Sequence, residues 1–263
     1  MIVDVFVARV PAHALAWLAG RLDDRERERA ARFLHAADRQ AYVAAHGVLR
    51  LALDYAAGQP CAWTFGVGDF GKPRLLDPPV TLFFNLSHNR QWVAVAVSRQ
   101  CEVGVDIETL DRSQDLADLD QAWLSGRERQ FLAHAPLTPA SVSGSEAGAV
   151  CDHGLQRLIW WVGKEALVKA VGCGLHQPLT ALTLPPGYDP GVWQQAVQLP
   201  SVFGPQGPAA WPWYIEHTPE FCLALAMHCP PRSRHDASEG WPAVRLHHVL
   251  LGPQEAILPA EFL

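Results

Sequence analysis

The sequence lacks several features that would assign it to a common class of protein. No uninterrupted apolar run approaches the roughly 18 residues of a membrane-spanning helix, so we expect no membrane span. The first four residues, MIVD, do not form a basic region followed by an apolar one, so we expect no signal peptide. The six cysteines include no C-x-x-C pair and no zinc-finger spacing, which indicates scattered thiols in a reducing compartment. These absences together predict a cytoplasmic protein.

The charge balance disfavours a further class, the general nucleic-acid binders. The net charge of the 263 residues is −6, which is mild and has the wrong sign for a polyanion-binding protein. A content of 49% hydrophobic and 18% charged residues is typical of a folded chain. The length allows one large domain or two of about 100–150 residues. Many of the Lys and Arg residues lie between Arg9 and Arg50, and this local basic patch favours a small phosphorylated ligand or an acidic partner.

Apolar and acidic residues alternate over 103–108, the most informative stretch of the chain. Val, Ile and the alternation predict a β-strand, on which Asp106 and Glu108 share one face. Two adjacent carboxylates raise each other's pKa unless a cation lies between them. A hard cation such as Mg²⁺ is the simplest partner, since it takes one or two carboxylates, waters and substrate phosphates. The alternative is an edge strand whose acidic face contacts water.

Residues 155–171 are predicted to form the longest apolar helix. Glu165 lies on the same stripe as Leu158 and Trp161, which places a carboxylate among core residues. An isolated buried carboxylate is costly, so Glu165 needs a cation. The alternative is a surface ion pair with Lys169, worth about 0.2–0.5 kcal/mol.

The amino-terminal region supplies basic side chains on predicted helices. In a charged helix over 23–34, Arg25, Arg29 and Arg32 share one face, although a solvated helix with Asp/Glu–Arg pairs is an equal alternative. A second helix, over 38–57, is predicted to begin at an Asp38 cap and to end at Gly58.

The order of predicted elements repeats itself. Helix 38–57 is followed by strands up to Val97, and helix 155–171 by strands up to Met227. We therefore predict an α+β fold with two similar halves related by a pseudo-two-fold axis, each an antiparallel sheet with one long helix, and a ligand cleft between them. The predicted boundaries are 1–108 for the first half, 109–229 for the second and 230–263 for a tail of uncertain role.

Further predictions concern the segments that connect these helices. The expected strands cover 2–10, 81–85, 92–98, 179–184, 192–199, 211–217 and 221–228. Residues 66–73 are expected to form a loop, 86–89 a turn, and 134–154 a loop or insertion. Ser125 and Glu128 have the spacing of a capping box at the start of another helix.

Three motifs together resemble a known family. They are G-V-D-I-E over 104–108, W-V-G-K-E-A-L-V-K over 161–169, and G-K-P over 71–73 followed by F-N-L-S-H over 84–88. In this combination the chain closely resembles the 4′-phosphopantetheinyl transferases of the surfactin-synthetase-activating type, over roughly residues 1–229. The resemblance implies transfer of the phosphopantetheine arm of coenzyme A to a serine of an apo acyl or peptidyl carrier protein. Adenosine 3′,5′-bisphosphate would be released.

The resemblance also implies roles for individual residues. Asp106, Glu108 and Glu165 would hold Mg²⁺, with Mn²⁺ as a possible substitute, and Glu165 or a metal-bound water would be the base. Lys169 and His88 would act beside them at the phosphates. The residues expected to contact coenzyme A are Arg29, Arg32, Lys72, Pro73, Ser87, His88, Lys164 and Lys169.

Two other functions stay open at this point. One is a Mg²⁺-dependent phosphohydrolase that acts on nucleotides, and the other is a protein that binds coenzyme A or a carrier protein without turnover. The intact acids argue against the second. We expect a monomer, and the sequence does not indicate whether its carrier protein serves fatty acid, polyketide or peptide synthesis.

Overall fold

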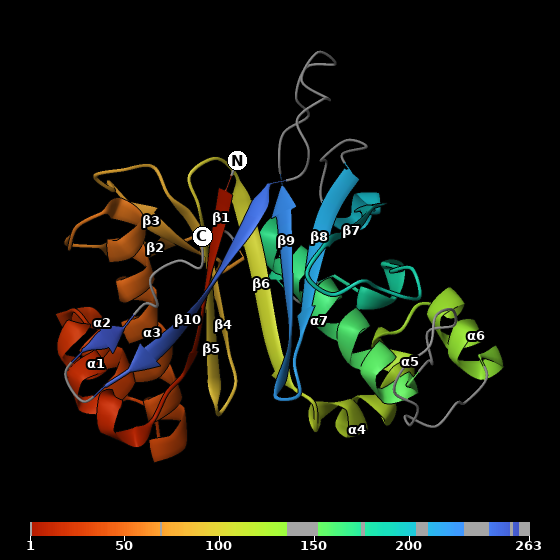
Figure 1. The fold of residues 1–263 in the computed structure, drawn as a ribbon, viewed down its shortest axis with the longest axis horizontal. Coiled ribbons are helices and arrows are strands. Elements are labelled where there is room, and N and C mark those ends of the chain that lie inside the picture. Colours follow the sequence, from red (N-terminus) through yellow and green to blue (C-terminus); the bar gives the residue numbers. More distant parts are fainter. Residues whose placement is uncertain are drawn as a thin grey trace, which may run out of the picture.

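The computed structural model describes residues 2–68, 70–135, 152–174, 177–203, 210–228, 242–252 and 255–257. It shows two halves side by side, each with helices on the outside and a sheet facing the other half (Figure 1). The α+β prediction is therefore confirmed. In the part of the chain that is described, no helix has the length and apolarity needed to cross a membrane.

The first half contains a sheet covered on its outer face by the long helix α3. The elements are β1 (Ile2–Arg9), α1 (Leu15–Arg21), α2 (Asp24–Ala31), α3 (Ala36–Ala57), β2 (Thr64–Val67), β3 (Pro73–Leu76), β4 (Phe83–His88) and β5 (Trp92–Ser98). The strand order of the sheet is β11-β10-β1-β5-β4, and β2 pairs with β3 in a separate hairpin. This puts β4 at the edge of the first sheet.

The second half places the long helix α7 on a four-stranded antiparallel sheet. Its elements are β6 (Glu102–Thr109), α4 (Arg112–Ala117), α5 (Asp120–Trp123), α6 (Gly126–His134), α7 (His153–Val171), β7 (Trp193–Gln198), β8 (Ala210–His217) and β9 (Phe221–His228). The strand order is β6-β9-β8-β7, so β6, which carries the alternating acids, is an edge strand.

Residues near the carboxyl end return to the first half. β10 (Ala243–Leu251) pairs in parallel with β1, and β11 (Ala256–Ile257) pairs with β10. The buried His247 ring stacks on Phe6 and lies 2.8 Å from Asp4, which fastens β10 to β1. Part of the predicted tail is thus a strand of the first sheet, and one pair in that sheet departs from the antiparallel expectation.

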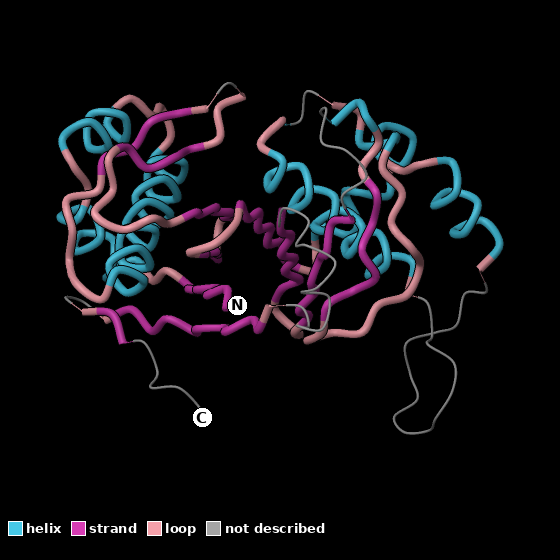
Figure 2. The backbone as a smooth tube through the Cα atoms, turned by 90° about the horizontal axis from the view of Figure 1, so that it is seen from above, coloured by secondary structure: helices cyan, strands magenta, loops and turns pink. Residues whose placement is uncertain are grey.

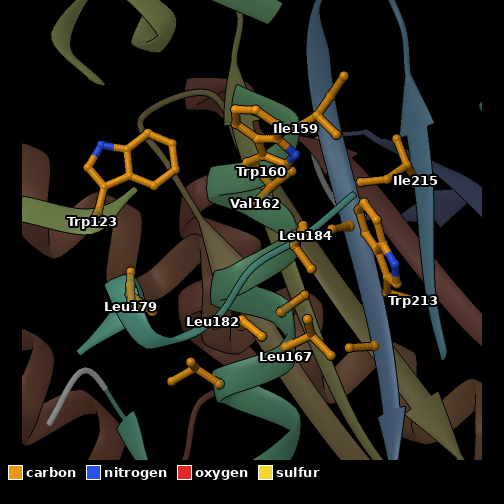
Figure 3. Close-up of a cluster of buried hydrophobic side chains, with 14 of the residues drawn as sticks. Trp123, Ile159, Trp160, Val162, Leu167, Leu179, Leu182, Leu184, Trp213 and Ile215 are labelled. Atoms are coloured by element: carbon orange, nitrogen blue, oxygen red, sulfur yellow. The ribbon is translucent and has the colours of Figure 1, made fainter. Parts of the chain in front are cut away.

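The apolar core has three layers, which fix how the halves meet. One cluster lies between α3 and the first sheet, and another, which includes Trp160 and Trp213, lies between α7 and the second sheet (Figure 3). A third lies between the two sheets and includes Val5 of β1, Val105 of β6 and Leu225 of β9. The view from above shows the resulting order, with helices outside and strands between them (Figure 2). Because Val105 faces the central layer, Asp106 and Glu108 face the opposite way, toward α7.

Several local predictions were wrong. The predicted strand 179–184 is a 3₁₀ turn over Leu179–Ala181 followed by irregular chain, and of the buried leucines only Leu182 and Leu184 have the spacing of a strand. The predicted loop 66–73 contributes to both strands of a hairpin, and the predicted turn 86–89 is mostly the end of β4. The helix α3 begins two residues before Asp38, after His35, with no side-chain cap. Its end at Gly58, with φ of 77°, is as predicted.

Candidate active site

A glycine on β6 lets the two elements that carry the acids come unusually close. A Cβ on Gly104 would lie 2.0 Å from the carbonyl oxygen of Ala166 and 2.3 Å from the backbone nitrogen of Ala170, both in α7. No side chain fits there, because those contacts are with helix backbone that cannot turn aside. The close approach brings Glu165 and Lys169 of α7 next to Asp106, two residues along β6.

Asp106 is the centre of the resulting cluster. It is 4% exposed, and its Oδ1 accepts hydrogen bonds from Lys169 Nζ at 2.6 Å and from Ser87 Oγ at 2.7 Å. Its Oδ2 is buried and, within the described chain, has no hydrogen-bond partner. A buried carboxylate oxygen without a partner is costly and points to a missing cation or donor.

Glu165 and Glu108 extend this negative charge. Burial first, and then the charge of Asp106, raise the pKa of Glu165 to about 7. The same two causes raise the pKa of Glu108 to about 7, with a further contribution from Glu165. Glu165 is buried, and its Oε1 has no partner among the described residues. The three carboxylates therefore carry more negative charge than Lys169 can offset.

This donor set fits a divalent cation. Carboxylate oxygens are the ligands that Mg²⁺ prefers, and Mg²⁺ completes its shell with water and phosphate oxygens. Two of the oxygens, on Asp106 and Glu165, are buried without a partner in the described structure. Over the described ranges no three His, Cys, Asp or Glu side chains already converge into a closed metal site, so the protein alone does not supply a full coordination shell.

Basic groups approach the cluster from the first half. Burial, and then the charges of Lys169 and His46, lower the pKa of His88, so both side chains lie near the end of β4. The ring of His46 stacks on Tyr42 with centroids 4.0 Å apart, and the Arg29 guanidinium lies over the same Tyr42 at 5.5 Å. A basic line thus runs from α2 through α3 and β4 to α7.

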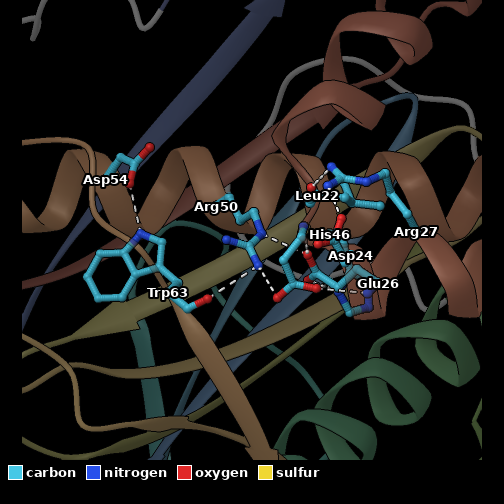
Figure 4. Close-up of polar contacts among 9 residues, drawn as sticks. Leu22, Asp24, Glu26, Arg27, His46, Arg50, Asp54 and Trp63 are labelled. Atoms are coloured by element: carbon cyan, nitrogen blue, oxygen red, sulfur yellow. Dashed lines mark hydrogen bonds and ion pairs between the residues drawn. The ribbon is translucent and has the colours of Figure 1, made fainter.

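A buried network holds this line in place (Figure 4). Glu26 accepts hydrogen bonds from His46 Nδ1 at 2.9 Å and from Arg50 Nε at 2.8 Å. Although burial opposes it, the hydrogen bonds from His46 and from the Asp23 backbone, together with Arg50, lower the pKa of Glu26. Glu26 stays ionised and orients the His46 ring.

Two lysines predicted to contact coenzyme A serve other purposes. Lys164 is fully buried in the second half, where it donates to Glu128 at 2.6 Å and to the carbonyls of Trp123 and Leu179. The prediction for Lys164 was therefore wrong, because nothing outside the core can reach its ammonium group.

Lys72, the second of these lysines, lies between the two halves. Its ammonium donates to Glu102 at 2.6 Å and to the carbonyls of Val103 and Ala170, so it ties the β2–β3 hairpin to β6 and α7. Pro73 begins β3. The structure thus gives Lys72 a structural role between the halves, and its expected contact with coenzyme A stays a prediction.

The remaining predicted site residues divide by location. Asp106, Glu108, Glu165, Lys169, Ser87 and His88 come together. Arg29 on α2 and Arg32, the residue that caps the end of α2, are exposed, and only Arg29 is seen against Tyr42 in the described contacts. Sequence reasoning missed Asn85, whose Oδ1 accepts a hydrogen bond from the Val105 N–H, and Glu26, although Asp23-x-x-Glu26 has the spacing of a capping box, which the structure contains.

Comparison with known proteins agrees with this geometry. Residues 102–226 match the family model of the 4′-phosphopantetheinyl transferase superfamily, named ACPS. The 4′-phosphopantetheinyl transferase HetI of Nostoc sp. is 31% identical over 170 residues, which are 63% of this chain and 65% of that protein. A 4′-phosphopantetheinyl transferase of Bacillus subtilis is 26% identical over 178 residues, covering 63% of this chain and 72% of that protein.

A third relative matches over a smaller share of both chains. The phosphopantetheinyl transferase of Thraustochytrium sp. is 28% identical over 162 residues, 61% of this chain and 56% of that protein. The chain thus spans just under two thirds of the Nostoc relative, at 65% of its length. The residues that match this superfamily model, 102–226, include Gly104 and the acids of β6 and α7.

Proposed function

We propose that this protein moves the phosphopantetheine arm of coenzyme A onto a serine of an apo carrier protein and releases adenosine 3′,5′-bisphosphate. One observation carries the proposal most strongly. Gly104 lets α7 lie against β6, so that the partly unpartnered carboxylates of Asp106 and Glu165 lie beside Lys169 and near His88. Acids that bind a cation next to bases that bind phosphate are what phosphoryl transfer requires.

The acids would hold the divalent cation. Asp106, Glu108 and Glu165 are the ligands we assign to it, and Mg²⁺ at this position would neutralise charge on the pyrophosphate. The Lys169 ammonium has three N–H donors, and the structure uses two of them on Asp106 and Ser87. The third would donate to the same phosphates. We propose Mg²⁺, with Mn²⁺ able to replace it.

The serine of the carrier protein needs a base. We propose Glu165, because it lies beside Asp106 and Lys169 and its Oε1 has no partner among the described residues, so a carboxylate oxygen is free to accept a proton. The serine oxygen would bond to the phosphorus that carries the pantetheine arm, while the bond from that phosphorus to the bridging pyrophosphate oxygen breaks. The proton would pass to Glu165, and the leaving group would depart as adenosine 3′,5′-bisphosphate.

The basic line of the first half would hold the nucleotide end of coenzyme A. His88 lies near Lys169 and His46, and Arg29 of α2 contacts the same Tyr42 ring on which His46 stacks. Arg32 is assigned with Arg29 on the resemblance of the sequence. The presence of two sheet-and-helix halves in one chain supports the surfactin-synthetase-activating type, and we propose that type together with a monomeric, cytoplasmic enzyme.

Intact-mass measurement on apo carrier proteins tests this function. The purified protein is incubated with coenzyme A, Mg²⁺ and a panel of acyl and peptidyl carrier proteins, with Asp106→Ala as the matched inactive variant. We expect a mass increase of one phosphopantetheine arm on at least one carrier. Release of inorganic phosphate with no change in carrier mass would instead indicate a phosphohydrolase, and binding without any product would indicate a binding protein.

A further inference from the structure

The two sheets meet at a seam between edge strands. β4 ends the first sheet and β6 ends the second, and the two strands lie beside each other (Figure 1). Neighbouring edge strands commonly pair through their backbones. Across the described residues of this seam, no such ladder joins β4 to β6, and side chains of β4 span the gap.

Two residues of β4 make these bridges. Asn85 Oδ1 accepts a hydrogen bond from the backbone N–H of Val105 at 3.0 Å, and Ser87 Oγ donates to Asp106 Oδ1 at 2.7 Å. Asn85 and Ser87 are two apart, so they share a face of β4, and they contact consecutive residues of β6. They are 6% and 7% exposed, so water competes little for either bond.

We propose that Ser87 is a positioning residue for Asp106, supported by Asn85, and that it leaves Asp106 Oδ2 available for a cation. The inference rests on the proposed function and deepens it at the same site. Ser87 was expected from the family resemblance to contact coenzyme A, and its hydrogen bonds assign it to Asp106.

The donor count decides between these two roles. A serine hydroxyl has one proton to donate. The neighbouring Lys169 ammonium, 3.0 Å from Ser87 Oγ, is donor-only, so the Ser87 proton goes to Asp106. Phosphate oxygens are acceptors, and Ser87 has no second proton for one. With this arrangement intact, Ser87 serves the carboxylate and Lys169 remains the group that turns to phosphate.

Titration of Mn²⁺, followed by the electron paramagnetic resonance signal of the free ion, tests the proposal without relying on activity. Ser87→Ala should weaken Mn²⁺ binding by roughly 10–100-fold, as is typical when a hydrogen-bond partner of a metal ligand is removed. Ser87→Thr, which keeps the hydroxyl, should recover most of the affinity. Ser98→Ala is the matched control, because Ser98 is also buried but accepts a hydrogen bond from the turn after β5, and it should bind Mn²⁺ as the wild type does.

Coenzyme A affinity in the absence of metal, measured by calorimetry, separates the two roles of Ser87. We expect Ser87→Ala to leave it within about two-fold of wild type, whereas loss of coenzyme A affinity with unchanged Mn²⁺ binding would overturn the proposal. A wild-type protein that binds no Mn²⁺ would overturn it as well. Failure of the proposed function would be visible separately, as unmodified carrier proteins alongside a preserved Mn²⁺ difference.

A second variant tests the support from Asn85. Asn85→Leu keeps a similar volume but cannot accept the Val105 N–H, so the exchange of that amide with deuterium should accelerate, and Mn²⁺ binding should weaken in parallel. Unchanged protection of the Val105 amide would contradict the assignment of Asn85 as the bridge.

Discussion

The two halves of the molecule share one layering and differ in how closely the helix approaches the sheet. In the first half, α3 packs on its sheet through large side chains such as Leu49 and Leu53. In the second half, Gly104 lets the α7 backbone approach β6 to a distance that excludes any Cβ. The first packing makes a core, and the second also brings Glu165 and Lys169 to the edge of the sheet. The close contact between α7 and β6 thus places residues of a core-packing helix in the site.

The halves also differ in charge. Arg29, His46 and His88 come from the first half, and Asp106, Glu108 and Glu165 from β6 and α7 of the second. Lys169 is the exception, a base on α7 that offsets part of the charge of Asp106. A ligand with a polyanionic end and a cation-binding pyrophosphate would therefore lie across both halves.

The largest expected effect comes from Glu165. Glu165→Gln keeps the shape of the side chain and removes its charge, so the transfer rate should fall by roughly 10²–10⁴-fold, as for loss of a general base. Coenzyme A binding should persist, because the basic line of the first half is untouched. Single-turnover rates and calorimetry on the same preparation measure both. A variant that kept its rate but lost coenzyme A affinity would show that the base lies elsewhere.

A substitution of Lys164 tests whether this residue stabilises the core of the second half. Lys164→Met would leave Glu128 buried without its cation, so the free energy of unfolding should fall by about 3–5 kcal/mol, measured by urea denaturation. Arg112→Met is the control, since the Arg112–Asp115 pair is exposed and should contribute less than about 1 kcal/mol. Equal effects of the two substitutions would contradict the assignment of Lys164 to the core.

Substitutions of Arg29 and Arg32 test whether the basic line binds the 3′-phosphate of coenzyme A. Arg29→Ala should weaken coenzyme A by roughly ten-fold or more, since a charge-assisted hydrogen bond contributes about 1.5–3 kcal/mol. Binding of 3′-dephospho-coenzyme A should change much less. We expect a smaller effect for Arg32→Ala, because only Arg29 is held over Tyr42 in the described contacts. If Arg29→Ala weakened binding of both ligands equally, the alternative interpretation of α2 as a solvated helix would be supported.

The smallest expected effect concerns pH. The pKa of Glu165 rises from its ordinary 4.5 to about 7 on folding, so the folded protein binds more protons than the unfolded chain between these values. This contribution to stability is fully present below about pH 4.5 and is lost as pH rises through about 7. The Tm of the metal-free protein should fall by a few degrees between pH 5 and 8, and less in Glu165→Gln. The exposed Glu28→Gln should follow the wild-type curve.

The sequence predicted the parts of the fold and site that depend on local pattern. The alternation over 103–108 and the long apolar helix follow from side-chain periodicity, as does the common face of Asp106 and Glu108. Periodicity gives no reason for Gly163, which lies inside the same helix. In the structure a Cβ there would lie 2.8 Å from Leu184 and 2.9 Å from Trp213, so the glycine is required by packing.

The sequence pattern could not predict which residues far apart in the chain contact each other. Lys164 and Lys169 are both lysines on one helix, and only the position of Glu128 and Asp106 in space decides that one is buried and the other reaches the site. Residues 86–89 were predicted to form a turn, but 86–88 extend β4, and the polar Ser87 bonds across the seam. The parallel pairing of β10 with β1 joins residues more than 240 positions apart, which no local pattern indicates.

The most direct test of the account is whether the two halves bind one ligand through a shared cation. Calorimetry of coenzyme A binding with and without Mg²⁺ measures this coupling in the wild type and in Asp106→Ala. We expect Mg²⁺ to tighten coenzyme A binding in the wild type, because the cation would lie between the acids of the second half and the pyrophosphate, and to have no effect in Asp106→Ala. Equal coenzyme A affinities with and without Mg²⁺ in the wild type would contradict the account.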